Sequence, residues 1–193
     1  ILADKNDVIL VGHGTAIPLI LEASRHSQLS GIVLTNGPII GPGRFTRTLC
    51  QLANLPYPLN RMVFHPSISV RFLASSIGLR RAVVNPYVME RDTVVTICDP
   101  IITNLENRRR SLTYLKSIAN RENLHAQKTL PTLISWGDAD RLTHCMKKVF
   151  SHFNPNTTTF KTIAGGQFLH PIERPWEIAQ TILDWTKKIE TTT

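Results

Sequence analysis

The sequence contains little cysteine and no long apolar run. A membrane-spanning helix needs about 20 consecutive apolar residues, and no run in this chain approaches that length. The three cysteines, Cys50, Cys98 and Cys145, are odd in number and lack both disulfide and metal-site spacing. We therefore expect free, mostly buried thiols in a reducing intracellular compartment, either the cytoplasm or an organelle interior, and we predict no metal and no cofactor.

Acidic residues are also scarce relative to basic ones. The chain has 22 Lys and Arg residues against 14 Asp and Glu, which gives a net charge of +8. Such a charge favours contact with nucleic acid or an anionic membrane surface, but it also describes an ordinary solvated surface. Apart from 108–110 the basic residues are scattered, and no nucleic-acid motif accompanies them. We prefer the solvated surface and leave membrane contact as an alternative that rests on charge alone.

The apolar pattern predicts an α/β protein with a parallel sheet and flanking helices. The length of 193 residues and the hydrophobic content of 42% suit one domain with a sizeable core. Short buried-type runs predict four strands, at 8–11, 31–35, 131–136 and 157–163. Helical spacing predicts helices at 17–24, 45–55, 68–77, 105–119, 142–153 and 176–189, with 92–97 ambiguous and with Arg108 on the outer side of its helix.

A glycine-rich corner joins the first strand to the first helix. It reads Gly12-His13-Gly14-Thr15-Ala16, which follows the strand–turn–helix pattern of a nucleophile elbow, G-x-S-x-G, with glycine at the serine position. Such corners also open dinucleotide-binding units, but that fingerprint needs a third glycine where Ile17 stands, and no acidic residue ends the next strand. The turn is therefore predicted without its attacking atom.

The corner resembles that of the α/β-hydrolase superfamily, in the subgroup that reads V-G-H-S-x-G. The segment from Pro131 to Leu142 resembles the acid strand of the same superfamily, and Asp140 matches the acid of the catalytic triad, with Asp138 as an alternate. Either carboxylate could instead cap the helix that is expected to follow. The resemblance covers nearly the whole chain but only the C-terminal two-thirds of a superfamily domain.

The segment Ala164 to Pro175 resembles the histidine loop of the superfamily, and the position of the catalytic histidine is Gln167. A glutamine amide cannot accept a proton near neutral pH, so general-base catalysis is lost there. His170 matches a secondary histidine, and it would have to move several ångströms to replace the base. Cys145 is expected on the wrong element to replace the nucleophile.

The resemblance also implies a domain organisation. Residues 1–40 and 130–193 would form the hydrolase-like core, and the mostly helical insert 41–129 would form a cap over the active-site cleft. The alternative is that the insert has a purely structural role. The residues expected to line a ligand cleft under this cap are His13, Gly14, Thr15, Ile39, Phe168 and His170.

The superfamily sheet has about eight strands, and this sequence supplies four. The elbow strand would then be an apolar sheet edge, which is an aggregation hazard. The residues before Asp7 resemble the end of a helix. We therefore expect a protein partner, or a segment upstream of Ile1, to complete the sheet.

Two of the three triad positions, Gly14 and Gln167, cannot perform their roles. Loss of a single triad member removes a factor of ~10⁴–10⁶ in rate. We therefore predict a catalytically degenerate α/β-hydrolase-like protein that serves as a binding, scaffold or accessory subunit and retains an apolar ligand cleft. The alternative is an active esterase- or lyase-like enzyme of this fold that uses a non-serine mechanism.

Overall fold

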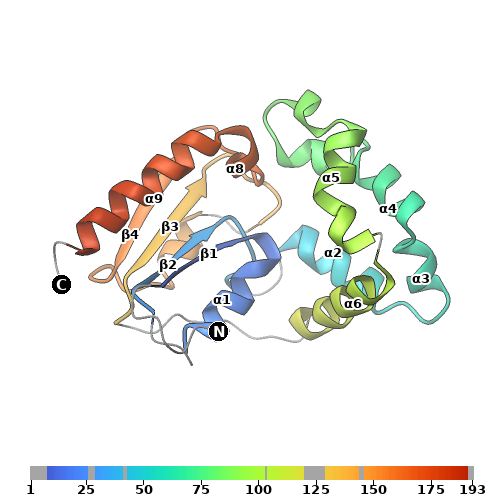
Figure 1. Cartoon of the computed structure of the whole chain (residues 1–193), viewed down its shortest axis with the longest axis horizontal. Helices are drawn as coiled ribbons and strands as arrows, with labels where there is room; N and C mark the ends of the chain where they lie inside the picture. Colours follow the sequence, from blue (N-terminus) through green and yellow to red (C-terminus); the bar gives the residue numbers. More distant parts are fainter. Residues whose placement is uncertain are drawn as a thin grey trace.

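The computed structural model describes residues 8–25, 29–40, 43–102, 104–119, 129–143 and 146–190. Its centre is a parallel sheet of four strands in the order β1 (Ile9–His13), β2 (Gly31–Thr35), β3 (Thr132–Gly137) and β4 (Thr158–Ile163) (Figure 1). Leu10 pairs with Ile32, which in turn pairs with Thr132. The predicted parallel α/β fold is confirmed, with strand boundaries within two residues of those expected.

Helices cover both faces of the sheet. Helix α1 (Ile17–Ala23) and helix α7 (Met146–Phe150) lie on one face, where Ile17, Ile134 and Trp136 belong to the main core. Helix α9 (Pro175–Glu190) lies on the other face and packs Trp185 against Val33. Figure 1 shows α1 and α9 on opposite sides of the strands. Both central strands are entirely buried, which accounts for their continuous apolar sequence.

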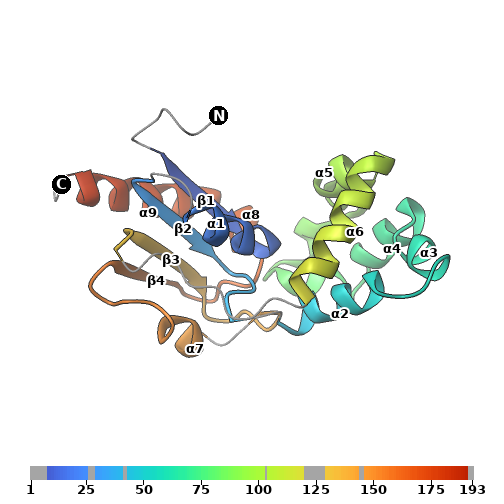
Figure 2. The ribbon, with the colours of Figure 1, turned by 90° about the horizontal axis from the view of Figure 1, so that it is seen from below.

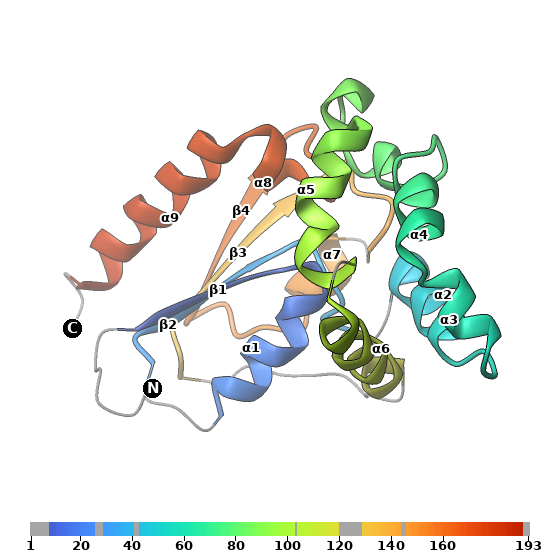
Figure 3. The same cartoon turned by 45° about the vertical axis from the view of Figure 1, so that its right-hand side comes forward.

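The remaining helices form a separate layer beside the carboxyl ends of the strands (Figures 2 and 3). We call residues 43–119 the cap. The cap contains α2 (Arg44–Ala53), α3 (Leu59–Val63), α4 (Pro66–Leu73), η2 (Leu79–Ala82), η3 (Pro86–Met89), α5 (Arg91–Ile102) and α6 (Leu105–Ala119). One apolar cluster, around Cys50 and Ile118, consists of cap residues, and another, around Met89 and Val94, also includes Leu169 from the loop after β4. The domain boundaries at residues 40 and 130 stay predictions.

Hydrogen bonds tie the cap to the core. The Leu169 N–H donates to the carbonyl oxygen of Ala82 at 2.7 Å. The carboxylate of Glu173, in α8 (His170–Glu173), accepts hydrogen bonds from the N–H groups of Val84 and Asn85. The Tyr114 hydroxyl donates to the carbonyl oxygen of Thr15 at 2.5 Å. The cap is therefore attached beside the glycine-rich corner and the loop that follows β4.

Several local predictions differ from the structure. The ambiguous segment 92–97 is helical, within α5, and the helix predicted over 142–153 is shorter, since α7 spans only Met146–Phe150. On α9, Leu183 is 54% exposed because it lies about 140° around the helix from the buried Ile178. Arg108 was expected on the outer side of α6, but it is half-buried against the other cap helices. Cys145 and residues 1–7 lie outside the described residues.

Candidate functional site

The glycine-rich corner has the geometry of a nucleophile elbow. Strand β1 ends at His13, the short helix η1 (Gly14–Ala16) follows, and α1 begins at Ile17. Gly14 has a φ of +56°, in the left-handed region that glycine adopts without a steric penalty. Its N–H donates to the carbonyl oxygen of Asn36 at 2.9 Å. The sharp turn is therefore present, with no side chain at its apex.

The side chain of Phe168 fills the space above this apex. A Cβ placed on Gly14 would lie 3.1 Å from Phe168 Cζ, which is closer than ordinary van der Waals contact. The phenyl ring also lies 4.7 Å from the His13 ring and 6.5 Å from the Phe45 ring, measured between centroids. Phe168 thus occupies the volume into which a nucleophile at position 14 would project.

His13 is largely buried beneath the corner. Its Nδ1 lies 2.8 Å from Thr35 Oγ1, and Thr35 in turn donates to the carbonyl oxygen of Gly12. Nδ1 is therefore assigned the proton, which leaves Nε2 as a buried acceptor without a partner in the described part of the chain. Burial, with a smaller contribution from His170, lowers the pKa of His13 to about 4. His13 is neutral at physiological pH.

His170 is fully buried and lies edge-on to His13, with ring centroids 6.5 Å apart. Its Nδ1 is 2.9 Å from the carbonyl oxygen of Gln167, so Nδ1 carries the proton and Nε2 is again a buried acceptor with no partner among the described residues. Burial lowers the pKa of His170, although the Gln167 carbonyl and the Asp140 charge act in the opposite direction. The two rings form a neutral, buried pair.

Asp140 is held by a set of hydrogen bonds. Its Oδ1 accepts from the Leu142 N–H at 2.8 Å, and its Oδ2 accepts from Asn36 Nδ2 at 2.6 Å and from the Thr143 hydroxyl. The alternate acid, Asp138, instead accepts from the Gly165 N–H at 2.7 Å. Asp140 thus lies at the expected edge of the sheet, but its contacts are to neighbouring loops.

Asn36 is the important residue that the sequence analysis missed. It is completely buried, and it joins three parts of the site. Its backbone carbonyl accepts from Gly14, its Oδ1 accepts from the Gly137 N–H at 2.9 Å, and its Nδ2 donates to Asp140. The sequence feature that could have identified it is an asparagine directly after a buried parallel strand. Polar side chains at such positions meet at the carboxyl edge of the sheet.

The remaining predicted residues lie in different environments. Gln167 lines a cavity, and its Oε1 is buried without a hydrogen-bond partner in the described ranges. Thr15 borders a second cavity, and Ile39 is packed in the main core at 1% exposure. The structure thus brings His13, Gly14 and Phe168 together with His170, whereas Ile39 belongs to the main core.

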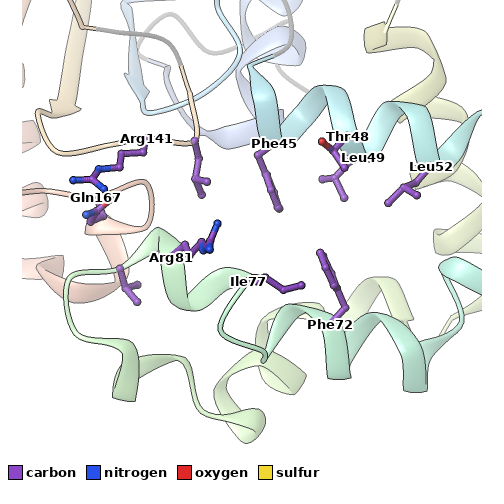
Figure 4. A pocket seen from close by; sticks show the side chains of 11 residues that line it. Phe45, Thr48, Leu49, Leu52, Phe72, Ile77, Arg81, Arg141 and Gln167 are labelled. Carbon is purple, nitrogen blue, oxygen red and sulfur yellow. The ribbon is translucent and has the colours of Figure 1, made fainter.

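Two adjoining cavities open beside the site. The first, which we call the cleft, has a volume of about 730 Å³ and lies between the cap and the loops after β3 and β4 (Figure 4). The second, which we call the apolar cavity, has a volume of about 540 Å³ and is lined almost entirely by cap residues, with Thr15 at one side. Both volumes are in the range of small-molecule sites.

The described residues contain no group of three or more His, Cys, Asp or Glu side chains that could hold a metal ion. Cys50 and Cys98 are free and buried, as predicted, and burial raises the pKa of both thiols. Their thiolate forms are therefore disfavoured, which argues against nucleophilic chemistry at either residue. Nor does any helix in the described ranges have both the length and the apolar character needed to span a membrane.

Comparison with solved structures agrees with this geometry. The chain resembles an esterase from Thermogutta terrifontis with a TM-score of 0.63 and 16% sequence identity, over 95% of this chain and 66% of the esterase. It also resembles an epoxide hydrolase, with a TM-score of 0.65 and 13% identity, and an ancestral haloalkane dehalogenase, with a TM-score of 0.69 and 16% identity. Each of these two matches covers 96% of this chain and 70% of the other chain. No family model and no curated protein matches the chain. The chain spans about two-thirds of the length of these structures, and the fold predicted from the motifs is confirmed.

Proposed function

Starting from the α/β-hydrolase fold of this chain, we propose that it is a non-hydrolytic member of that fold that binds an apolar small molecule in the cleft, as a binding or accessory subunit. The observation that carries this proposal is the Phe168 ring above Gly14, in the volume that an attacking side chain would need. A site with neither a nucleophile nor a general base cannot form an acyl intermediate.

The polar groups around the corner support the same conclusion. A general base works best when its pKa lies near the operating pH and its free nitrogen reaches the reacting atom. His13 has a pKa of about 4, and the pKa of His170 is lowered as well. Both Nε2 atoms are buried. Gln167, at the base position, offers an amide that does not accept a proton near neutral pH.

The competing proposal is an enzyme of this fold with a non-serine mechanism. It would need His170 as the base, because no other histidine follows the acid position in the loop after β4. The Nδ1 of His170 is occupied by the Gln167 carbonyl, and the ring is fully buried. The competing mechanism therefore requires rearrangement of the whole loop.

Ester hydrolysis separates the two proposals. We expect the wild-type protein and Asp140→Asn to hydrolyse p-nitrophenyl acetate and butyrate at the same low rate, within twofold, because Asp140 has no triad to serve. We also expect 1-decanol to displace the apolar dye Nile red from the folded protein. Turnover that Asp140→Asn lowers tenfold or more, in a variant with wild-type thermal stability, would establish the enzyme instead.

We further propose that the outer edge of β1 is covered in the native protein by an additional strand, from a partner or from an upstream part of the chain. Within the described ranges β1 pairs only with β2, and Val11 on β1 is 54% exposed. An apolar edge of this kind invites pairing with another strand. The aligned part of this chain also covers only 66% of the similar esterase and 70% of the similar epoxide hydrolase.

Native mass spectrometry of the protein isolated from its source tests this edge. We expect either a chain heavier than 21.7 kDa or a stoichiometric complex with a second protein. A heavier chain would assign the extra strand to the same polypeptide, and a complex would assign it to the partner. A lone 21.7 kDa monomer that stays soluble would contradict the proposal.

A further inference from the structure

The cleft has a basic end and an apolar end. Arg81 from η2 and Arg141 after β3 lie at one end together with Gln167 (Figure 4). The opposite end is lined by Leu52 and Phe72. None of the described residues that line the cleft is acidic. The cleft is therefore polarised along its length, with positive charge confined to one end.

The described part of the chain does not neutralise the two arginines. Among the described residues the ion pairs involve Arg25, Arg110 and Arg174, and neither Arg81 nor Arg141 has an acidic partner. The neighbouring Asp140 directs its oxygens to Asn36, Leu142 and Thr143 instead. Two guanidinium groups without partners at one end of a cavity form a suitable site for a carboxylate, which arginine can bind through two parallel hydrogen bonds.

The apolar end suits a hydrocarbon chain. Phe45, Leu49, Leu52 and Phe72 line the cleft and also the apolar cavity beside it. A chain that follows this shared wall leaves Arg81 and Arg141 behind and lies against these four apolar side chains. Burial of such a chain supplies the main part of the affinity, and the charged head determines its direction.

We propose that the ligand of the cleft is an amphiphilic carboxylate, with its head held by Arg81 and Arg141 and its hydrocarbon chain lying against Phe45 and Phe72. This inference rests on the proposed function, because it assigns the chemical class of the molecule that the cleft binds. It excludes neutral and cationic amphiphiles as preferred ligands. It also predicts that affinity falls as ionic strength rises, since the arginine side chains are exposed to solvent.

Binding of sodium decanoate, measured by displacement of Nile red, tests this assignment. We expect decanoate to bind at least tenfold more tightly than 1-decanol or decyltrimethylammonium, with the two ionic probes below their micelle concentrations and 1-decanol below its solubility limit. The double variant Arg81→Gln with Arg141→Gln should lose at least tenfold in decanoate affinity while its affinity for 1-decanol stays within twofold. The control is Arg80→Gln, which removes one positive charge from an exposed neighbour that does not line the cleft.

Each outcome has a definite reading. Equal decanoate affinity in the double variant and the wild type, with both folded, would overturn the role of the arginines. Tighter binding of 1-decanol than of decanoate would overturn the carboxylate class and leave the apolar cleft of the proposed function intact. Failure of all three probes to displace dye from the folded protein would overturn the inference, and the ligand-binding part of the proposed function with it.

Discussion

The triple variant Gly14→Ser, Gln167→His, Phe168→Ala should hydrolyse p-nitrophenyl acetate at least about 100-fold faster than the wild type, measured as the steady-state release of nitrophenolate. The variant restores the nucleophile and the base at the positions where the fold has room for them. A complete triad supplies factors of ~10⁴–10⁶, so even an imperfect one should exceed the background clearly.

The structure gives a reason for each of the three changes. The backbone at Gly14 already has the left-handed conformation of a nucleophile elbow, at φ +56°, and a serine there incurs about 1–2 kcal/mol of strain. The Phe168 ring lies 3.1 Å from the new Cβ and must be reduced before the hydroxyl can reach a substrate. Asp140 is present and oriented by Asn36. We therefore expect Gly14→Ser with Gln167→His alone to stay near the wild-type rate.

The matched control has alanine in place of serine at position 14, with the other two changes kept. It carries the same backbone strain at position 14 and the same space left by the Phe168 ring, but it has no attacking oxygen. Its rate should therefore equal that of the wild type. If the folded serine variant is no faster than this alanine control, then the introduced serine and histidine are not aligned with Asp140 for catalysis.

The sequence predicted the fold because its signals are local and strong. The buried apolar runs of β2 and β3, and the Gly12–Ala16 corner between a strand and a helix, leave few other arrangements. The position of Gly14 at the apex of the turn was predicted by the same pattern. These features depend on residues close together in the chain, and such features can be predicted without coordinates.

The parts that the sequence did not predict depend on contacts between distant segments. Asn36 is separated from Asp140 by 104 residues, and only the folded sheet edge brings them within hydrogen-bond distance. The packing of Phe168 over Gly14 likewise joins residues from opposite ends of the chain. Arg108 was expected at the surface because it belongs to a charged run, yet the cap helices half-bury it. Periodicity within one helix cannot predict what the neighbouring helices cover.

Acidification from pH 7.5 to pH 4 should lower the free energy of unfolding of the wild type by about 3 kcal/mol more than that of His13→Asn. The pKa of His13 is about 4 in the folded protein and 6.5 when the group is unperturbed. Between these two values the unfolded chain binds more protons than the folded one, so stability is fully present above pH 6.5 and is lost as the pH falls toward 4. The lowered pKa of His170 adds to the loss in the same direction.

Urea unfolding at several pH values provides the measurement. The variants separate the contribution of the His13–His170 pair from other effects of low pH on stability. An asparagine at position 13 keeps a polar group for Thr35 but has no proton to gain, whereas His65→Gln in the cap should retain the wild-type loss. Parallel curves for the wild type and His13→Asn would contradict the buried neutral pair. A histidine kept neutral by burial costs stability in acid and offers no base to a substrate. The same burial that creates this acid sensitivity therefore supports the proposed binding role over a catalytic one.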